Sequence, residues 1–279
     1  MSSQPVRARP SLFRALGRQD PPVEVTIRGK KYQRIDIYKH DSWAATALYR
    51  GDDGDVVCKF NRTQPIVIIP MKWLGRMLAR REARALQRLN GVPGIPAESG
   101  AVFANGRHCE NTVAHEFIAG HPLGANEEVS STFFIELRQV LDAVHRNGIA
   151  YVDLHKRENI VVNENGRPYL VDFQVCFARW WPRQGANPLH RMILRVLQQI
   201  DWYHFGKHVS RHRPEQMSLL PAGMGERPMC ISMHRLFAVP LRTLRRSLLT
   251  ALGVRAAGGQ ATSEAFPEDA VRRELQRAA

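Results

Sequence analysis

The sequence has few cysteines, no long apolar run and comparatively few acidic residues. Its four cysteines are widely spaced and form no Cys-x-x-Cys pair, so neither a zinc site nor a disulfide framework is indicated. The apolar run PIVIIPM at residues 65–71 is far shorter than the ~20 residues that cross a bilayer. The first 22 residues carry positive charge without a continuous apolar core, so we expect no secretory signal and reduced thiols in the cytosol.

The shortage of acids leaves a large excess of positive charge. The 279 residues include 40 Lys and Arg against 26 Asp and Glu, a net charge of +14. This excess favours an acidic partner: a nucleotide, a phosphorylated glycolipid, an anionic membrane surface or nucleic acid. Nucleic acid is the weakest of these candidates, because an exposed face with aromatic residues interleaved among basic ones is not clearly visible.

Most strand patterns lie in the first half of the chain. Residues 1–22 are rich in Arg, Pro and Ser and are expected to form a disordered basic tail. From Val23, VEVTIRG and KYQRIDIYKH alternate apolar and polar residues. ATALYR and VVCKF flank the turn GDDGD, which predicts a β-hairpin.

One helix interrupts these strands. Apolar residues recur at helical spacing from Met71 to Leu89, with arginines on much of the other face. The following GAVFANGRHCENTVAHEFIAG predicts two strands around an Asn-Gly turn, and Gly120 to Gly124 break the pattern.

The second half is predicted to be mainly helical. Helical spacing covers residues 130–148, with Gly148 as the stop, and residues 187–208. Between these helices, residues 160–173 predict a hairpin with NENG at its turn. A basic helical segment is expected at residues 236–252.

Several segments follow the order of the protein-kinase fold. VVCKF ends a strand with Lys59, as the kinase VAIK strand does, and RREARALQRL offers Glu82 as its ion-pair partner. DAVHRNGIAYVDLHKREN resembles the catalytic loop, with Asp153 and Asn159, and YLVDFQ resembles the strand ending in DFG, with Asp172. HEFIAGHPL resembles the interlobe hinge that holds adenine.

The likeness is strongest to the small atypical branches of this fold. These are the RIO kinases and the bacterial lipopolysaccharide-core kinases, which include Kdo kinase. The stretch WLGRMLARREARALQRLNGVPGIP favours the second branch, and no APE motif follows Asp172. The resemblance implies an α+β, two-lobed protein-kinase-like fold. It divides the chain into a tail (1–22), a β-rich N-lobe with one helix (23–118), a mainly helical C-lobe (119–255) and a flexible C-terminal tail (256–279).

The resemblance also implies roles for individual residues in phosphoryl transfer from ATP. Lys59 would meet the α- and β-phosphates, and Glu82 would fix it by an ion pair. Asp153 would accept or orient the proton of the acceptor hydroxyl. Asp172 and Asn159 would supply the hard oxygen ligands that Mg²⁺ prefers.

Further contacts to the nucleotide are expected from both halves. Ser42 lies on the loop expected to cover the phosphates, and Glu116 and Ile118 lie in the hinge segment. Lys156 is either a partner for the transferring phosphate or a solvated loop lysine.

The sequence departs from the kinase pattern at four places. The phosphate-covering loop KHDSWAAT contains no glycine, Gln174 replaces the glycine of DFG, and Tyr151-Val152 replaces the usual His-Arg, so we expect no activation-loop switch. Asn159 follows Asp153 by six positions, where the family has five. Either the loop bulges or Glu158 takes the metal position, and we favour Asn159 because it directly precedes the strand IVV.

The acceptor is the most open part of the prediction. Residues 236–252 combine an apolar stripe with arginines, which fits either an interfacial helix or a core helix with a basic face. Trp180 and Trp181 fit a membrane interface, an acceptor site or core packing.

The leading hypothesis is a cytoplasmic ATP- and Mg²⁺-dependent kinase of a hydroxyl acceptor, such as a lipopolysaccharide-core sugar, with peripheral association on the inner face of the membrane. The alternatives are a RIO-like serine/threonine protein kinase and a pseudokinase scaffold.

Overall fold

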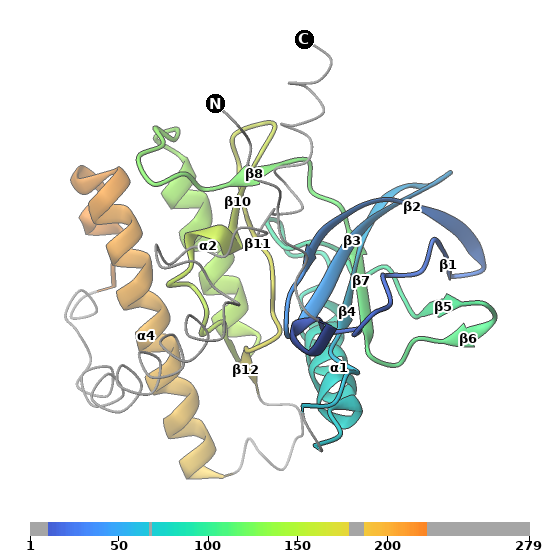
Figure 1. The fold of residues 1–279 in the computed structure, drawn as a ribbon. Coiled ribbons are helices and arrows are strands. Elements are labelled where there is room, and N and C mark those ends of the chain that lie inside the picture. Colours follow the sequence, from blue (N-terminus) through green and yellow to red (C-terminus); the bar gives the residue numbers. More distant parts are fainter. Residues whose placement is uncertain (1–10, 67–68, 179–186, 222–279) are drawn as a thin grey trace, which may run out of the picture.

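A computed structural model of the chain describes residues 11–66, 69–178 and 187–221 (Figure 1). The fold is α+β, as predicted, with a large curled antiparallel sheet beside a group of helices and short strands. Three predicted features lie outside the described residues: the Trp180-Trp181 pair, the basic helix at 236–252 and the tail from 256.

The large sheet has seven strands in the order β6-β5-β1-β2-β3-β4-β7, and every pairing is antiparallel. Its strands are β1 (Glu24–Ile27), β2 (Lys30–His40), β3 (Ala44–Gly51), β4 (Gly54–Asn61), β5 (Val102–Ala104), β6 (Arg107–His108) and β7 (Thr112–Glu116). The predicted strands and the β3–β4 hairpin are confirmed. The Asn-Gly turn joins β5 to β6, and a third strand, β7, follows and pairs with β4 at the opposite edge.

Helix α1 (Lys72–Arg88) confirms the predicted helix and lies against β4 and β7. Glycine at position 75 permits this approach, since a Cβ there would stand 2.3 Å from the carbonyl oxygen of Arg62. Glu82 is buried on the face of α1 that meets the sheet, whereas Arg80 is exposed on the other side. The close packing of the helix therefore carries one acidic side chain to the sheet.

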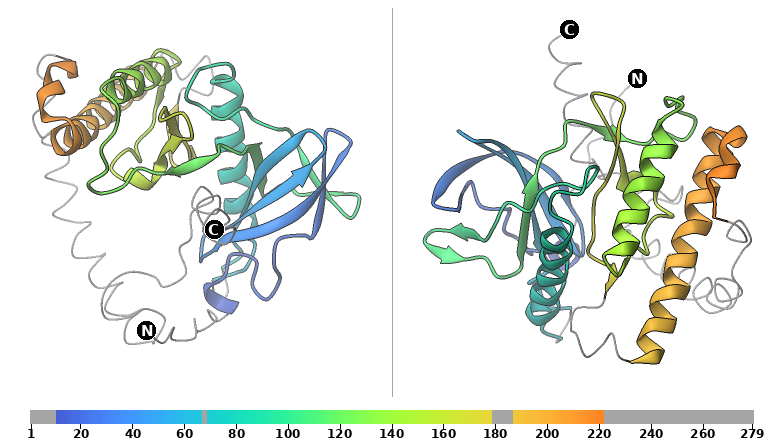
Figure 2. Two further views of the ribbon diagram at one scale, coloured as in Figure 1. Left: turned by 90° about the horizontal axis from the view of Figure 1, so that it is seen from above. Right: turned by 180° about the vertical axis from the view of Figure 1, so that it is seen from behind.

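The other half contains two long helices that run side by side (Figure 2) and two small sheets. The helices are α2 (Phe133–Arg146) and α4 (Pro188–His212), with short 3₁₀ turns η2 (Arg157–Asn159) and η3 (Pro214–Leu219). The sheets are β11-β10-β8 and β12-β9, made of β8 (Gly120–Pro122), β9 (Ile149–Ala150), β10 (Ile160–Asn163), β11 (Pro168–Leu170) and β12 (Phe177–Ala178).

Both predicted helices and the β10–β11 hairpin are confirmed. Gly148 follows α2 with a φ of +67°, a backbone conformation suited to a helix stop. A single apolar core joins this half to α1, with Leu86 of α1, Phe134 of α2 and Phe205 of α4 in one buried cluster. Within the described ranges, no helix is long and apolar enough to cross a membrane.

Two expectations about local structure are wrong. The segment from Ser11 is not a free tail, because it begins with the 3₁₀ turn η1 (Ser11–Phe13) and buries Ala15 completely. The amide of Ala15 donates to Asp41 O at 2.7 Å, and its carbonyl accepts from Thr63 N at 3.0 Å. The Gly120–Gly124 segment is also not a simple break, since β8 pairs with β10.

Candidate active site

Lys59 lies at the centre of a buried cluster of charges. Its Nζ is 3.2 Å from Glu82 Oε2 on α1 and 2.6 Å from Asp172 Oδ1, just after β11. The Lys59 and Glu82 side chains are 11% and 2% exposed, and Asp172 is 34% exposed. Three residues far apart in sequence are therefore brought together, as expected for Lys59 and Glu82.

Burial and the attraction between opposite charges shift the pKa values of this cluster in opposite directions. Burial alone would lower the pKa of Lys59, but Asp172 and Glu82 raise the pKa above its usual value. Burial alone would raise the pKa of Asp172, and the Lys59 ammonium instead holds it low. Burial raises the pKa of Glu82 to about 7, although Lys59 opposes this shift. Lys59 thus stays charged, and Asp172 is the more exposed of its two carboxylate partners.

A second cluster surrounds Asp153 on the loop between β9 and β10. Asp153 Oδ2 accepts hydrogen bonds from Lys156 Nζ at 2.7 Å and from Asn159 Nδ2 at 3.0 Å. Its Oδ1 is 3.3 Å from His155 Nδ1. Asp153 is only 7% exposed in its side chain, whereas Lys156 and His155 are half exposed. The carboxylate is therefore fixed while two of its partners reach it from solvent.

The 3₁₀ turn η2 accommodates the extra residue between Asp153 and Asn159. Asn159 is buried and bonded to Asp153, whereas Glu158 is 35% exposed and pairs with Arg157 at 3.8 Å. The backbone carbonyl of Asn159 accepts from Val171 N at 3.1 Å. This pairing holds Asn159 beside the segment that leads into Asp172, as the preference for Asn159 over Glu158 requires.

Asp201 on α4 holds the backbone just before Asp153. This role was not anticipated from the sequence. It is fully buried, and its carboxylate accepts from the backbone amides of Tyr151 and Val152, both at 2.7 Å. Its Oδ2 is also 3.0 Å from His145 Nε2. Val152 has a φ of +72°, which is rare for a β-branched residue and requires such support.

A signal for Asp201 was present in the sequence. It stands between Ile200 and Trp202 in a predicted helix, and an acid at a core-facing position demands a buried partner. His208 gives the loop a further contact from α4, because its Nε2 donates to Leu154 O at 2.7 Å.

Tyr151 connects the two clusters. Its hydroxyl donates to the carbonyl of Val171, and its ring meets Phe173 edge-on at 5.0 Å and 76°. Asp172 lies between these two contact residues, with a φ of +62°. The tyrosine that departs from the His-Arg pattern thus packs the Asp153 loop against the segment that carries Asp172.

The residues expected to contact adenine and phosphate, Ile118, Glu116 and Ser42, lie outside the two charged clusters. Ile118 is buried in an apolar cluster with Val161 and Val171. Glu116 has an exposed side chain, and its amide already donates to Ala97 O at 2.9 Å. Within the described residues, neither Glu116 nor Ser42 hydrogen-bonds to Lys59, Asp153 or Asp172.

The loop between β2 and β3 makes contacts of its own. Ser42 Oγ donates to Phe13 O at 3.1 Å. Asp41 Oδ1 accepts from the amides of Trp43 at 2.6 Å and Ala44 at 2.9 Å. An acidic side chain therefore already occupies two backbone amides of the loop that was expected to cover the phosphates.

The donor set fits a magnesium ion. Among the described residues, no three His, Cys, Asp or Glu side chains are grouped as metal ligands. Magnesium, however, needs only one or two protein oxygens beside phosphate and water. Asp172 Oδ2 is free of the Lys59 contact, and the amide oxygen of Asn159 takes no part in its bonds to Asp153. These two oxygens are the ligands that the described residues offer.

Comparison with known proteins supplies no family. The sequence matches no protein-family model, and no curated protein matches it significantly. The case for a function therefore depends on the geometry of the two clusters.

Proposed function

We propose that the chain is an ATP- and Mg²⁺-dependent phosphotransferase with a two-lobed, protein-kinase-like fold that phosphorylates a hydroxyl acceptor. The observation that carries the proposal is the pairing of Lys59 with both Glu82 and Asp172, next to a fixed Asp153. The sheet with α1 would form one lobe and α2 with α4 the other, and the apolar cluster around Ile118 would receive adenine.

Lys59 suits the binding of nucleotide phosphates. Its ammonium is held by Glu82, which is 2% exposed, so its position is set before any ligand arrives. Its second partner, Asp172, is the more exposed of the two. A fixed cation costs little reorganisation when charge develops during transfer. Lys59 would therefore orient the phosphates while Asp172 turns its carboxylate to the metal.

Asp153 suits the activation of an acceptor hydroxyl. Its carboxylate is oriented by the amide of Asn159, and Lys156 reaches it from solvent. A hydroxyl hydrogen-bonded to this carboxylate would donate its proton to it as the new O–P bond forms, while the bond from the γ-phosphorus to the β–γ bridging oxygen breaks and ADP leaves. Lys156, which is half exposed, would leave Asp153 for the transferring phosphate.

Mg²⁺, when bound, would supply positive charge that neutralises the phosphates. Asp172 and Asn159 would hold it. Their oxygens, one carboxylate and one amide, are of the type that Mg²⁺ prefers.

One observation favours a second candidate, a pseudokinase scaffold that transfers no phosphate. Asp41 occupies the amides of Trp43 and Ala44, and Ser42 Oγ is engaged by Phe13. If these contacts persist, the glycine-free loop offers the phosphates few donors. A scaffold of this kind would bind a partner without consuming ATP.

The test is transfer of the γ-phosphate from labelled ATP into a cell lysate separated into glycolipid and protein. Wild type is expected to label the glycolipid fraction, as a lipopolysaccharide-core sugar kinase would. Asp153→Asn is expected to lose at least ~100-fold, the lower range for a general base. Asp142→Asn, an exposed carboxylate on α2, is the matched control and retains full activity.

The other outcomes decide between the alternatives. Label in protein alone points to a RIO-like protein kinase and overturns the glycolipid acceptor. No label from folded wild type, in any fraction, supports the scaffold and overturns the phosphotransferase.

A further inference from the structure

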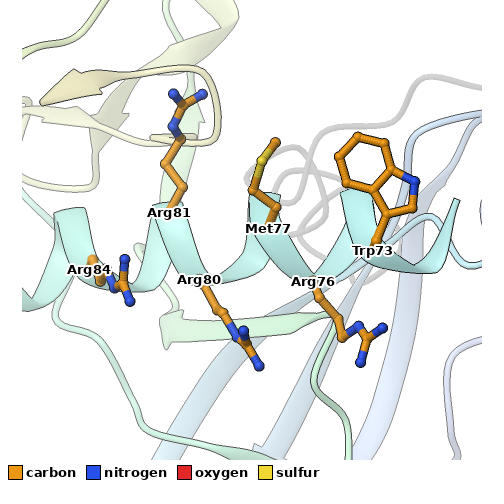
Figure 3. A pocket seen from close by; sticks show the side chains of 6 residues that line it. All are labelled: Trp73, Arg76, Met77, Arg80, Arg81 and Arg84. Carbon is orange, nitrogen blue, oxygen red and sulfur yellow. The ribbon is translucent and has the colours of Figure 1, made fainter. Parts of the chain in front are cut away.

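The outer face of α1 carries a strongly basic groove. The helix has six Lys and Arg residues, and its one acid, Glu82, is buried against Lys59. An open groove of about 600 Å³ runs along the helix (Figure 3). It is lined by Trp73, Arg76, Met77, Arg80, Arg81 and Arg84. The face turned away from the candidate active site is therefore cationic along several turns.

Within the described part of the chain, the ion pairs of Arg76 and Arg80 share a single acidic partner. Glu110 pairs with Arg76 at 2.9 Å and approaches Arg80 at 3.9 Å. All three side chains are 44–62% exposed, and ion pairs at such exposure are weak and easily exchanged. One carboxylate shared by Arg76 and Arg80 leaves this pair of arginines with a net positive charge.

Large apolar side chains stand among these cations. Trp73 and Met77 are 56% and 45% exposed, and Figure 3 shows them projecting from the same side of α1 as Arg81. Arg76 and Arg80, which line the same groove, point downward in the view of Figure 3. Exposed tryptophan and methionine cost hydration free energy in water. Flanked by arginines, they form the combination found on helices that lie at membrane interfaces.

Two further exposed apolar residues precede α1 in the chain, Ile66 and Ile69. The run Ile66 to Ile69 is apolar throughout, and both terminal isoleucines are exposed, at 36% and 56%. Each of their amides donates to the carbonyl of the other, at 3.0 and 2.9 Å. The buried Arg62 fixes the residues just before this run by donating to Gln64 O at 2.7 Å and Pro65 O at 3.1 Å. The two ends of this run are thus held together, with the side chains of Ile66 and Ile69 exposed.

We propose that this surface, defined as Ile66, Ile69, Trp73 and Met77 with Arg76, Arg80 and Arg81, docks the protein on a membrane that contains anionic phospholipids. The isoleucines, Trp73 and Met77 enter the boundary between headgroups and acyl chains, and the arginines bind lipid phosphates. An acidic protein would satisfy the arginines but would leave these apolar side chains without matching surface. The inference does not depend on the proposed phosphotransferase activity.

The test is sedimentation of the full chain with vesicles, without nucleotide. Wild type is expected to bind vesicles of phosphatidylcholine with about one third phosphatidylglycerol, and to bind phosphatidylcholine alone weakly. Arg76→Gln with Arg80→Gln is expected to weaken binding about 30-fold, at roughly fivefold for each lost cation. The matched control is Lys31→Gln with Arg107→Gln, which removes the same charge from exposed strand positions and leaves binding within twofold.

A second pair of variants tests the apolar part. Trp73→Ser is expected to weaken binding to the same vesicles at least fivefold, whereas Trp43→Ser, at another exposed tryptophan, leaves it unchanged. The melting temperature of each variant establishes that it is folded.

Three results would overturn the proposal. One is equal binding by the α1 variants and wild type, which would assign membrane binding to another part of the chain. Another is failure of folded wild type to bind either vesicle. The third is binding to polyglutamate but not to vesicles, with loss in the arginine variant, which would identify an acidic protein as the occupant.

Discussion

The two clusters of the candidate active site are built in different ways. The Lys59 cluster joins β4, α1 and the segment after β11, and its Lys59–Glu82 pair is almost fully buried. The Asp153 cluster is local, with all its members between residues 153 and 159, and two of its three partners are half exposed. The first cluster is therefore fixed by the fold, whereas the second has side chains that a substrate can displace.

This difference suggests that the two clusters have different roles. A cation held by distant elements can position a nucleotide, because its geometry is set before binding. A carboxylate covered by half-exposed cations can admit an acceptor, because a surface ion pair exchanges at little cost. The local cluster depends on Asp201 for its backbone, and the buried cluster does not.

The largest expected effect is the loss of that support. Asp201→Ala leaves the amides of Tyr151 and Val152 without their acceptor in a buried site, at a cost of roughly 3–5 kcal/mol in the free energy of unfolding. Thermal unfolding should show a drop of roughly 10 °C, against a negligible change in Asp142→Ala. In the folded protein, nucleotide affinity should survive better than transfer. Equal stability of Asp201→Ala and wild type would contradict this account of the loop.

Each cluster has a buried histidine that makes the fold sensitive to acid. Burial lowers the pKa of His115, beside Lys59, and of His208, below the Asp153 loop, to about 4. The unfolded chain protonates both near pH 6.5, so stability is full above that pH and is lost as the pH falls towards 4. Each residue contributes up to roughly 3 kcal/mol of this loss.

A variant of His208 isolates its contribution to the pH dependence of stability from that of His115. His208→Gln keeps a donor for Leu154 O and should flatten the dependence of the free energy of unfolding on pH between 6.5 and 4. Denaturant unfolding at four pH values measures the slope. A slope unchanged from wild type would show that His208 takes up a proton as readily in the fold as in the unfolded chain.

The smallest expected effect is that of Lys156→Ala. Its pair with Asp153 is half exposed, so stability should change by less than about 1 kcal/mol. Transfer should fall about tenfold if Lys156 moves to the phosphate, and Lys207→Ala, at an exposed lysine on α4, should have no effect. A large loss of stability in Lys156→Ala would show that Lys156 is held as firmly as the Lys59 cluster. The contrast between the Lys59 and Asp153 clusters would then be wrong.

The sequence predicted the helices and strands that carry this site better than the long-range contacts that hold them in place. The strand that carries Lys59, the helix that carries Glu82 and the hairpin before Asp172 follow from local periodicity, which depends on near neighbours. The order of motifs also indicated that Lys59 and Glu82 would pair. The preference for Asn159 over Glu158 as a metal ligand stays a prediction, and the strand that follows Asn159 sets its position beside Asp153.

The partners of the residues that support the site could not be predicted, because these contacts join distant segments. Asp201 meets its partners 49–56 positions away, and no local pattern specifies them. The packing of Ala15 against Asp41 and Thr63 is likewise invisible in a segment rich in Arg and Pro. The contacts of Ser42 depend on that same packing, so its expected role could not be judged from the sequence.

The most direct test of the central claim is binding of Mg²⁺-ATP, measured by titration calorimetry on wild type and Lys59→Met. Lys31→Met, at a lysine 75% exposed, is the matched control. The account predicts that wild type and the control bind with the same affinity and that Lys59→Met, although folded, loses at least tenfold. Absence of binding by folded wild type, or equal binding by Lys59→Met, would contradict the assignment of this cluster to a nucleotide.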